Sequence, residues 1–263
     1  MNRTDGTLLE QIWNKVPEVT IFFWFIKVLA TTVGETAGDL LSTRLGLGLT
    51  VTSWVMGVVC IAALIWQVRT KRYYPTPYWL EVVLISVVGT LISDLLVDGL
   101  GISLVITTIA FSITLAAVFL AWYASERTLS IHTIFTTRRE LFYWAAILAT
   151  FALGTSAGDL AAETLNFGYG PSAIIFAAVI AVVASSYYLL KLDAILCFWA
   201  AYILTRPLGA SLGDYFAKPH LAGGLGWGTI NTSIVFLTAI AVLVVFLTAT
   251  RIDRTPASAT ESA

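Results

Sequence analysis

Aspartate residues within apolar stretches are the feature of this sequence most able to do chemistry. Each stands near the end of a segment long enough to form a membrane-spanning helix, and the acids are Asp39, Asp94, Asp159 and Asp214. Ionisable groups inside membrane helices are costly, usually face the interior of a bundle, and mark ion or proton pathways. The four aspartates are therefore the first candidates for a binding site. The alternative is that they lie in water at the helix ends.

A second carboxylate stands one helical turn away from three of these aspartates. The additional acids are Glu35, Asp98 and Glu163, each four residues from its neighbour. Residues at this spacing share a helix face, and like charges there repel unless a cation or proton lies between them. Hydroxyl side chains crowd the two turns before each aspartate, and they are Thr31, Thr32, Thr36, Ser86, Thr90, Thr150, Thr155, Ser156, Thr205 and Ser211. Such oxygen-rich surroundings favour Mg, Ca or Mn over Cu or Zn.

Two cationic residues lie within the same apolar segments. Arg206 precedes Asp214 by eight residues and is followed by Pro207, which removes a backbone donor and tends to kink a helix. We assign Arg206 to charge balance, either by fixed neutralisation of the acids or as a counter-ion that a substrate cation displaces. Lys27 precedes Asp39 by twelve residues. It either shares the balancing role or extends its amine to the membrane surface.

The four aspartates belong to an internal repeat with the pattern W-x9-G-x3-[GS]-D. Successive aspartates are 55, 65 and 55 residues apart, so a two-copy unit is itself duplicated. A fixed period shared by several copies indicates a repeat architecture. The tryptophans are Trp24, Trp79, Trp144 and Trp199. If they lie at a membrane interface, the aspartates lie about 22 Å further along each helix, in the opposite half of the membrane.

Small residues four apart precede every repeat aspartate. The pairs are Gly34 and Gly38, Gly89 and Ser93, Gly154 and Gly158, and Gly209 and Gly213. Such pairs let two membrane helices approach closely. Helix packing alone explains them, and close approach would also bring neighbouring aspartates together, so the two roles are compatible.

Composition places the chain among polytopic membrane proteins. It is 58% hydrophobic and only 12% charged, whereas soluble domains carry about 25% charged residues. The fold class we expect is all-α, with about eight transmembrane helices arranged as four parallel two-helix repeats. Each apolar run can cross roughly 30 Å of hydrocarbon, and the runs are residues 18–43, 50–68, 78–98, 102–124, 141–164, 171–190, 194–217 and 229–250.

The repeats divide the chain into one integral membrane domain with two halves. Residues 1–125 and 141–250 each hold two repeats, 126–140 form a linker loop, and 251–263 form a disordered tail. Lys and Arg in the loops predict that both termini are cytoplasmic. On that side lie Arg3, Lys15, Arg69, Lys71, Arg72, Arg127, Arg138, Arg139, Lys191, Arg251 and Arg254, against only Arg44 and Lys218 on the other.

Several classes of function find no support. The net charge of −1 gives no basis for nucleic-acid binding, and no nucleophile elbow, Walker loop, HExxH or CxxC motif indicates an enzyme. Cys60 and Cys197 lie in apolar runs and are expected to be buried hydrophobes. We expect no permanently bound cofactor and no cleavable signal peptide. The expected partners are the lipid bilayer and an inorganic cation, and the sequence leaves open whether the chain forms a homo-oligomer.

Two runs resemble a known bacterial family. They are Phe142-Tyr143-Trp144 continuing to Thr150-Phe151-Ala152-Leu153-Gly154-Thr155, and Tyr202-Ile203-Leu204-Thr205-Arg206-Pro207-Leu208-Gly209-Ala210-Ser211. The family consists of uncharacterised membrane-anchored proteins built from repeats of unknown function. The resemblance covers essentially the whole chain and implies a multi-pass protein of the bacterial inner membrane. It implies little about a substrate. The second copy departs most from the pattern, with Ser93 in place of glycine.

These observations favour a membrane transporter for a hard inorganic cation, with manganese and export preferred. The repeat aspartates would bind the cation. Glu35, Asp98 and Glu163 would extend the path or relay protons, and Arg206 and Lys27 would balance charge. Two alternatives remain. One is a scaffold or sensor subunit that transports nothing, and the other is a proton-coupled carrier of a small organic cation.

Overall fold

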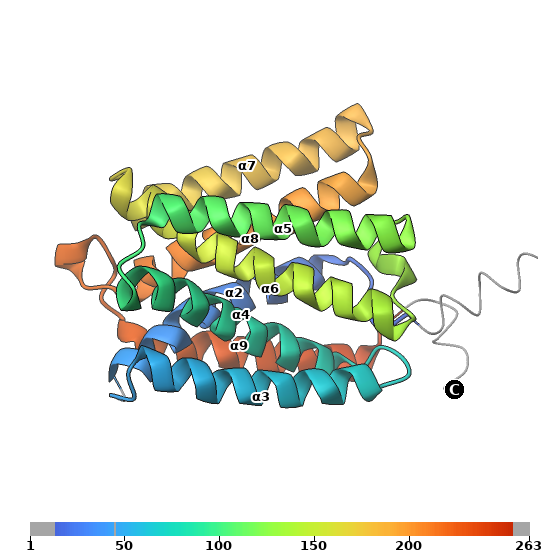
Figure 1. The fold of residues 1–263 in the computed structure, drawn as a ribbon, viewed down its shortest axis with the longest axis horizontal. Coiled ribbons are helices and arrows are strands. Elements are labelled where there is room, and N and C mark those ends of the chain that lie inside the picture. Colours follow the sequence, from blue (N-terminus) through green and yellow to red (C-terminus); the bar gives the residue numbers. More distant parts are fainter. Residues whose placement is uncertain (1–13, 45, 255–263) are drawn as a thin grey trace, which may run out of the picture.

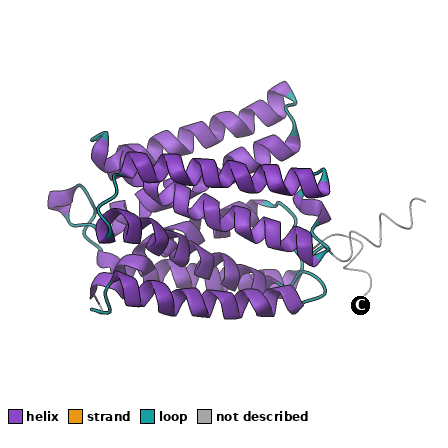
Figure 2. Ribbon diagram, viewed as in Figure 1, coloured by secondary structure: helices purple, strands orange, loops and turns teal. Residues whose placement is uncertain are grey.

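The computed structural model of the protein describes residues 14–44 and 46–254. These residues form helices joined by short loops and turns, and no strand occurs among them (Figure 2). Within residues 14–44 and 46–254, eight helices are long and apolar enough to cross a membrane, which confirms the expected fold class. Their α-helical bounds are α2 Ile21–Asp39, α3 Leu49–Arg69, α4 Pro75–Asp94, α5 Leu104–Glu126, α6 Thr137–Asp159, α7 Tyr169–Leu190, α8 Ala194–Ala217 and α9 Gly228–Thr250.

Local sequence signals set where these helices begin. Thr20, Ser103, Thr136 and Asp193 cap α2, α5, α6 and α8, and each side chain accepts a hydrogen bond from a backbone N–H of the first turn. Such caps satisfy backbone donors that have no partner within the helix. Pro75 occupies the first position of α4, where its missing N–H costs nothing.

Helices α2, α4, α6 and α8 form a central ring, and we call them the core helices. Each packs against the next, and α8 packs against α2 to close the ring. The remaining helices lie outside it, with α3 against α4, α5 against α6, α7 against α8 and α9 against α2 (Figure 1). Each outer helix therefore packs on the core helix of the following repeat, and the last repeat joins the first.

Small residues allow the core helices to approach this closely. The glycine five residues before each aspartate faces the residue eight before the aspartate of the next core helix. The pairs are Gly34 with Ser86, Gly89 with Phe151, Gly154 with Arg206 and Gly209 with Thr31. A Cβ atom at Gly89 would lie 2.6 Å from Phe151 Cβ. The packing role predicted for the small-residue pairs is therefore present in all four interfaces of the ring.

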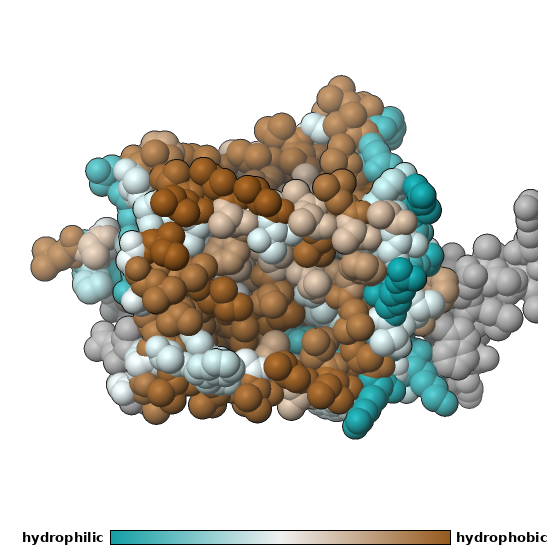
Figure 3. Space-filling model, viewed as in Figure 1, coloured by the Kyte–Doolittle hydropathy of each residue, from teal (hydrophilic) through white to brown (hydrophobic). Residues whose placement is uncertain are grey.

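The surface of the molecule matches a membrane-spanning body. On the face shown in Figure 3, apolar side chains cover the middle, and hydrophilic side chains gather towards the ends. The outer helices expose many large apolar residues, and the core helices are the more buried set. The described ends of the chain meet at one end of the bundle, where Glu18 N–H donates to Asp253 O. We call this the terminal end.

Two boundaries differ from expectation. The linker is shorter than residues 126–140, because α5 ends at Glu126 and α6 begins at Thr137. Part of the expected disordered tail is ordered, because Asp253 is buried and accepts a 2.5 Å hydrogen bond from the Tyr73 hydroxyl. Residues 255–263 of that tail lie outside the described residues.

Candidate functional site

The repeat aspartates all lie at the end of the ring opposite the terminal end, because the core helices are parallel and share one register. Helices α2, α4 and α6 end at Asp39, Asp94 and Asp159, and a single π-helical turn follows each. These turns are Leu40–Arg44, Leu95–Gly99 and Leu160–Thr164. Isolated π-helical turns are rare and often occur at functional sites. We call this end of the bundle the acidic end.

Three carboxyl groups from three core helices converge there. Glu35 of α2, Asp159 of α6 and Asp214 of α8 each offer an oxygen, and these oxygens lie within 4.8 Å of one another. Glu35 and Asp214 are buried and Asp159 is partly exposed. Oxygens that bind Ca²⁺ at 2.3–2.6 Å are at most about 5 Å apart. This acid triangle can therefore enclose a hard cation after small side-chain movements.

The other predicted acids lie outside the triangle. Asp39 and Asp94 hold the same register on α2 and α4 and are partly exposed. Asp98 and Glu163 lie one turn further towards the acidic end and are exposed, and Glu163 accepts a 3.0 Å hydrogen bond from the Tyr169 hydroxyl. The structure therefore places Asp98 and Glu163 towards the solvent side of the triangle and not within it.

Lys218 is a cation of this end that the sequence analysis left out of the site. Its Nζ lies 3.5 Å from Asp214 Oδ1 and 3.8 Å from Asp39 Oδ2. Burial opposes the charge of the amine, but Asp214 and Asp39 outweigh burial and raise the pKa of Lys218 above its usual range. The spacing in the sequence could have placed Lys218 at the site, because Lys218 follows Asp214 by four residues, as Asp98 and Glu163 follow their own aspartates.

Arg206 lies in the interior of the ring, directly beside the triangle. Its guanidinium is fully buried, and Nη2 lies 3.2 Å from Glu35 Oε2. Nη2 also donates to the hydroxyls of Thr90 and Thr155, and Nη1 donates to Thr31 O at 3.1 Å. One side chain of α8 thus binds all three other core helices.

The partners of Arg206 follow a simple rule of register. Glu35, Thr90 and Thr155 each stand four residues before their repeat aspartate, and Arg206 stands eight before its own. Residues four apart lie above one another on a helix face. The faces that carry the aspartates therefore turn towards the centre of the ring, and the sequence predicted the acids and hydroxyls there without predicting which of them would pair.

Lys27 does not reach the membrane surface, which corrects one of the two expected roles. Its side chain is fully buried, and Nζ lies 3.9 Å from the centre of the Phe151 ring and 4.0 Å from that of Tyr202. Nζ has no hydrogen-bond acceptor among the described residues. Aromatic faces attract cations, so Phe151 and Tyr202 partly replace the missing anion.

Aromatic side chains fill the ring between Lys27 and the terminal end. Sixteen residues before the aspartates stand Phe23, Tyr78, Tyr143 and Phe198. The rings of Phe23 and Phe198 lie 6.0 Å apart, and the hydroxyls of Tyr78 and Tyr143 are 2.5 Å apart. The repeat tryptophans adjoin this layer. Trp79, Trp144 and Trp199 are buried, so these three do not form the interfacial belt that the sequence suggested.

The repeats also show which family the chain belongs to. A family model described as Repeat of Unknown Function (DUF347) matches the chain four times, at residues 22–73, 77–128, 142–192 and 197–253. The chain belongs to the DUF347 repeat family. Each match in this DUF347 protein covers most of one core helix and the whole outer helix that follows it. The resemblance noted from the sequence is thereby confirmed. Neither the curated proteins nor the solved structures contain a match to the chain.

Proposed function

We propose that this protein is a membrane carrier for a hard divalent cation that binds at the acid triangle. The observation that carries the proposal is the convergence of Glu35, Asp159 and Asp214 from three different core helices. Carboxylates brought this close repel one another, and a cation between them removes the repulsion. Carboxylate oxygens suit Mg²⁺, Ca²⁺ and Mn²⁺.

The described charges at this end favour a cation over an anion. Five carboxyl groups lie in or beside the triangle, namely those of Glu35, Asp39, Asp94, Asp159 and Asp214, and the cations paired with them are Arg206 and Lys218. Arg206 already binds Glu35 in this structure. A divalent cation in the triangle would compete with Arg206 for that carboxylate, and this competition would link substrate binding to movement of the core helices.

The filled interior of the ring favours a carrier over an open channel. Arg206, Lys27 and the aromatic layer lie in succession between the acid triangle and the terminal end. The bias of Lys and Arg predicts a cytoplasmic terminal end, so the triangle would open to the outside in this state. Manganese is our first candidate and export our preferred direction.

The test is the metal content of bacterial cells that produce the wild type, Asp159→Asn or Asp193→Asn, measured by elemental analysis for Mn, Mg, Ca, Fe, Co, Ni and Zn. Asp193 is exposed at the start of α8, and asparagine also caps helices, so Asp193→Asn is the matched control. We expect one divalent metal to shift with the wild type and the control and to recover with Asp159→Asn.

A shift in no metal, with equal amounts of the three proteins in the membrane, would contradict the proposal. It would favour a scaffold, a sensor subunit or a carrier of an organic cation. A metal that shifts equally with Asp159→Asn and the wild type would place the binding site outside the acid triangle. The direction of the shift distinguishes export, which lowers the cellular metal, from import.

A further inference from the structure

One of the four outer helices does not follow the pattern of the others. Each outer helix carries a buried hydroxyl near the acidic end, at Thr52, Thr107, Ser172 and Thr232. These residues align the outer helices, with five extra residues in the turn before α9. Near the acidic end, α7 therefore packs on the ring as its three counterparts do.

The outer helices differ fifteen residues further on, towards the terminal end. At this position α3, α5 and α9 carry Gln67, Trp122 and Leu247, and each of these side chains is at most 1% exposed. The aligned residue of α7 is Tyr187, which is 40% exposed. In Figure 1, α7 inclines away from the bundle towards this end. One side of the ring, beside α8 and α2, is therefore left without the cover that the others have.

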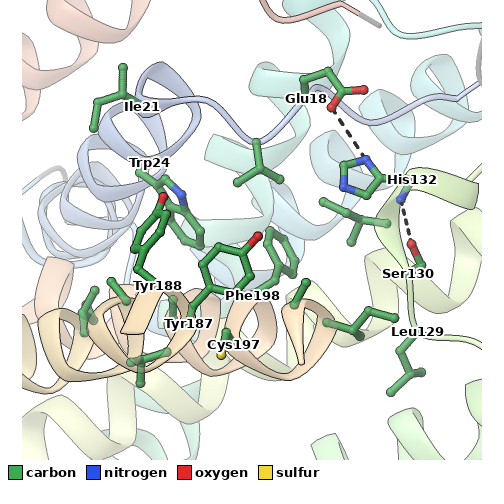
Figure 4. Close-up of a pocket in the computed structure, with 18 residues that line it drawn as sticks. Glu18, Ile21, Trp24, Leu129, Ser130, His132, Tyr187, Tyr188, Cys197 and Phe198 are labelled. Atoms are coloured by element: carbon green, nitrogen blue, oxygen red, sulfur yellow. Dashed lines mark hydrogen bonds and ion pairs between the residues drawn. The ribbon is translucent and has the colours of Figure 1, made fainter. Parts of the chain in front are cut away.

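A cavity of about 550 Å³ occupies the uncovered place. Trp24 of α2, Tyr187 and Tyr188 of α7, and Phe198 of α8 surround it (Figure 4). The repeat supports this assignment, because Trp24 is partly exposed while its counterparts Trp79, Trp144 and Trp199 are buried. The cavity exists because α7 does not cover the Trp24 side chain.

The cavity has apolar walls and a polar rim. Its walls are aliphatic and aromatic, and its rim at the terminal end carries Glu18, Ser130 and His132. His132 Nδ1 lies 3.7 Å from Glu18 Oε2 (Figure 4). Two of the lining residues, Tyr188 and Ile21, are large apolar side chains that are mostly exposed. The cavity therefore opens on the lipid-facing surface, with its polar rim beyond the membrane-spanning segments.

We propose that this cavity binds one glycerophospholipid with a zwitterionic, amine-bearing headgroup. An acyl chain lies between α7 and the α2–α8 side of the ring, and the headgroup lies at the rim. Charge complementarity supports this occupant, because the Glu18 carboxylate can pair with an ammonium group and the His132 imidazole can donate to a phosphate oxygen. The lipid covers the side of the ring that Gln67, Trp122 and Leu247 cover in the other repeats.

Composition argues against the C-terminal tail of the chain as the occupant. Residues 255–263 read Thr-Pro-Ala-Ser-Ala-Thr-Glu-Ser-Ala and contain no large apolar side chain to fill it. The volume lies within the range of small-molecule sites, about 300–1,000 Å³.

The first test is native mass spectrometry of the purified full-length protein after addition of palmitoyl-oleoyl phosphatidylethanolamine. The variant Ala184→Trp fills the cavity from α7, because Ala184 lines it. The matched control is Ala178→Trp, an exposed position of α7 that is not among the lining residues. We expect the wild type and Ala178→Trp to retain one lipid that Ala184→Trp loses, with occupancy lowered at least fivefold. Equal retention by all three proteins, or equal loss in both variants, would overturn the proposal.

A second measurement does not depend on the folding of Ala184→Trp. Cys197 lines the cavity, and the other cysteine, Cys60, is removed by Cys60→Ser. Phosphatidylethanolamine should slow the alkylation of Cys197 by N-ethylmaleimide in detergent several-fold. An unchanged rate would show that the cavity does not hold the lipid. Slowing that persists with palmitoyl-oleoyl phosphatidylglycerol at the same concentration would overturn the assignment of the headgroup.

Discussion

Arg206 connects the candidate site to the rest of the ring. Its guanidinium presents several donors in a rigid planar fork, and these bind Glu35, Thr90, Thr155 and the carbonyl of Thr31. A lysine could supply the same charge from one point but could not reach partners on three helices at once. The identity of this residue therefore matters for stability as well as for charge.

Replacement of Arg206 by lysine should lower the apparent melting temperature of the purified protein by roughly 5–10 °C. The variant keeps a buried cation beside Glu35 but leaves buried hydroxyls without their donor, which costs about 1–3 kcal/mol. The measurement is thermal unfolding in detergent. Arg138→Lys is the control, because the Arg138 side chain is 69% exposed. This variant should unfold at the same temperature as the wild type. A melting temperature of Arg206→Lys equal to that of the control would show that the fork geometry is unimportant.

Asp253 gives the terminal end a pH dependence. Burial raises the pKa of its carboxyl, and the hydrogen bond from Tyr73 only partly opposes this. The folded state then binds more protons than the unfolded state between the ordinary aspartate pKa, about 3.9, and the raised value. Because folding stability falls with pH where the folded state binds more protons, ionisation of Asp253 destabilises the fold as the pH rises through this window.

Asp253→Asn should remove this cost while it keeps an oxygen that accepts from Tyr73. The melting temperature of Asp253→Asn minus that of the wild type should therefore increase by a few degrees between pH 4 and pH 7. Thermal unfolding at intervals of half a pH unit measures this difference. Asp193→Asn changes an exposed aspartate, and its difference from the wild type should be flat. A difference for Asp253→Asn that falls with pH would reverse the assignment.

Residue types and spacing predicted most of the charged interior, because the fourfold register turns equivalent residues towards the same centre. Asp159 and Asp214 of the acid triangle were predicted to bind the cation, and Glu35 was predicted to extend its path. Spacing could not predict the hydrogen bonds of Arg206, since these depend on which helices adjoin it. It also left the environment of Lys27 open, because the aromatic rings that contact it come from α6 and α8.

The elements of the ring depend on one column of glycines. At Gly89 the backbone of α4 contacts α6 so closely that an added Cβ would lie 3.1 Å from Ala152 N as well as close to Phe151. A neighbouring backbone atom cannot move aside as a flexible side chain can. Gly57 of α3 offers a contrast, because nothing lies within 4 Å of its would-be Cβ.

Gly89→Ala should therefore destabilise the protein by about 1–3 kcal/mol, the usual cost of overpacking a closely packed interface. Gly57→Ala makes the same chemical change on an outer helix and should be neutral or slightly stabilising, because alanine favours helix more than glycine does. Midpoints of thermal unfolding in the same detergent give the comparison. Equal midpoints for the two variants would mean that the core helices can separate locally without cost.

At the level of elements, periodicity and length predicted all eight helices to within a few residues. They did not predict the π-helical turns after Asp39, Asp94 and Asp159, because these reflect how the chain turns into the outer helices. Nor did they predict the inclination of α7. Its sequence is as apolar as those of the other outer helices, and the difference emerges only from the contacts that Tyr187 fails to make.

The whole molecule is a closed ring in which the fourth repeat completes the first. Helix α9 packs against α2 although almost the entire chain separates them, and Ser233 Oγ donates to Thr36 Oγ1 at 2.8 Å. The parallel order of the repeats follows from an even number of helices per repeat. The sequence does not show that the ring closes within a single chain, since α9 of one copy of a repeat protein could pack against α2 of a neighbouring copy in the same way.

A pair of cysteines at Thr36 and Ser233 tests closure within one chain. Their hydroxyl oxygens are close enough that the Cβ atoms should approach the spacing of a disulfide, about 3.5–4.5 Å. In a Cys60→Ser, Cys197→Ser background, mild oxidation should therefore join α2 to α9 within single chains. Non-reducing electrophoresis and peptide mass spectrometry would show monomers carrying the cross-link.

The control pair is Thr36→Cys with Thr248→Cys, because Thr248 lies on α9 but is exposed near its other end. It should form no disulfide within the chain. Cross-linked dimers from Thr36→Cys with Ser233→Cys, in place of cross-linked monomers, would mean that α9 covers the α2 of a neighbouring chain. The acid triangle would then depend on assembly, because the α9 that supports its α2 helix would come from another copy.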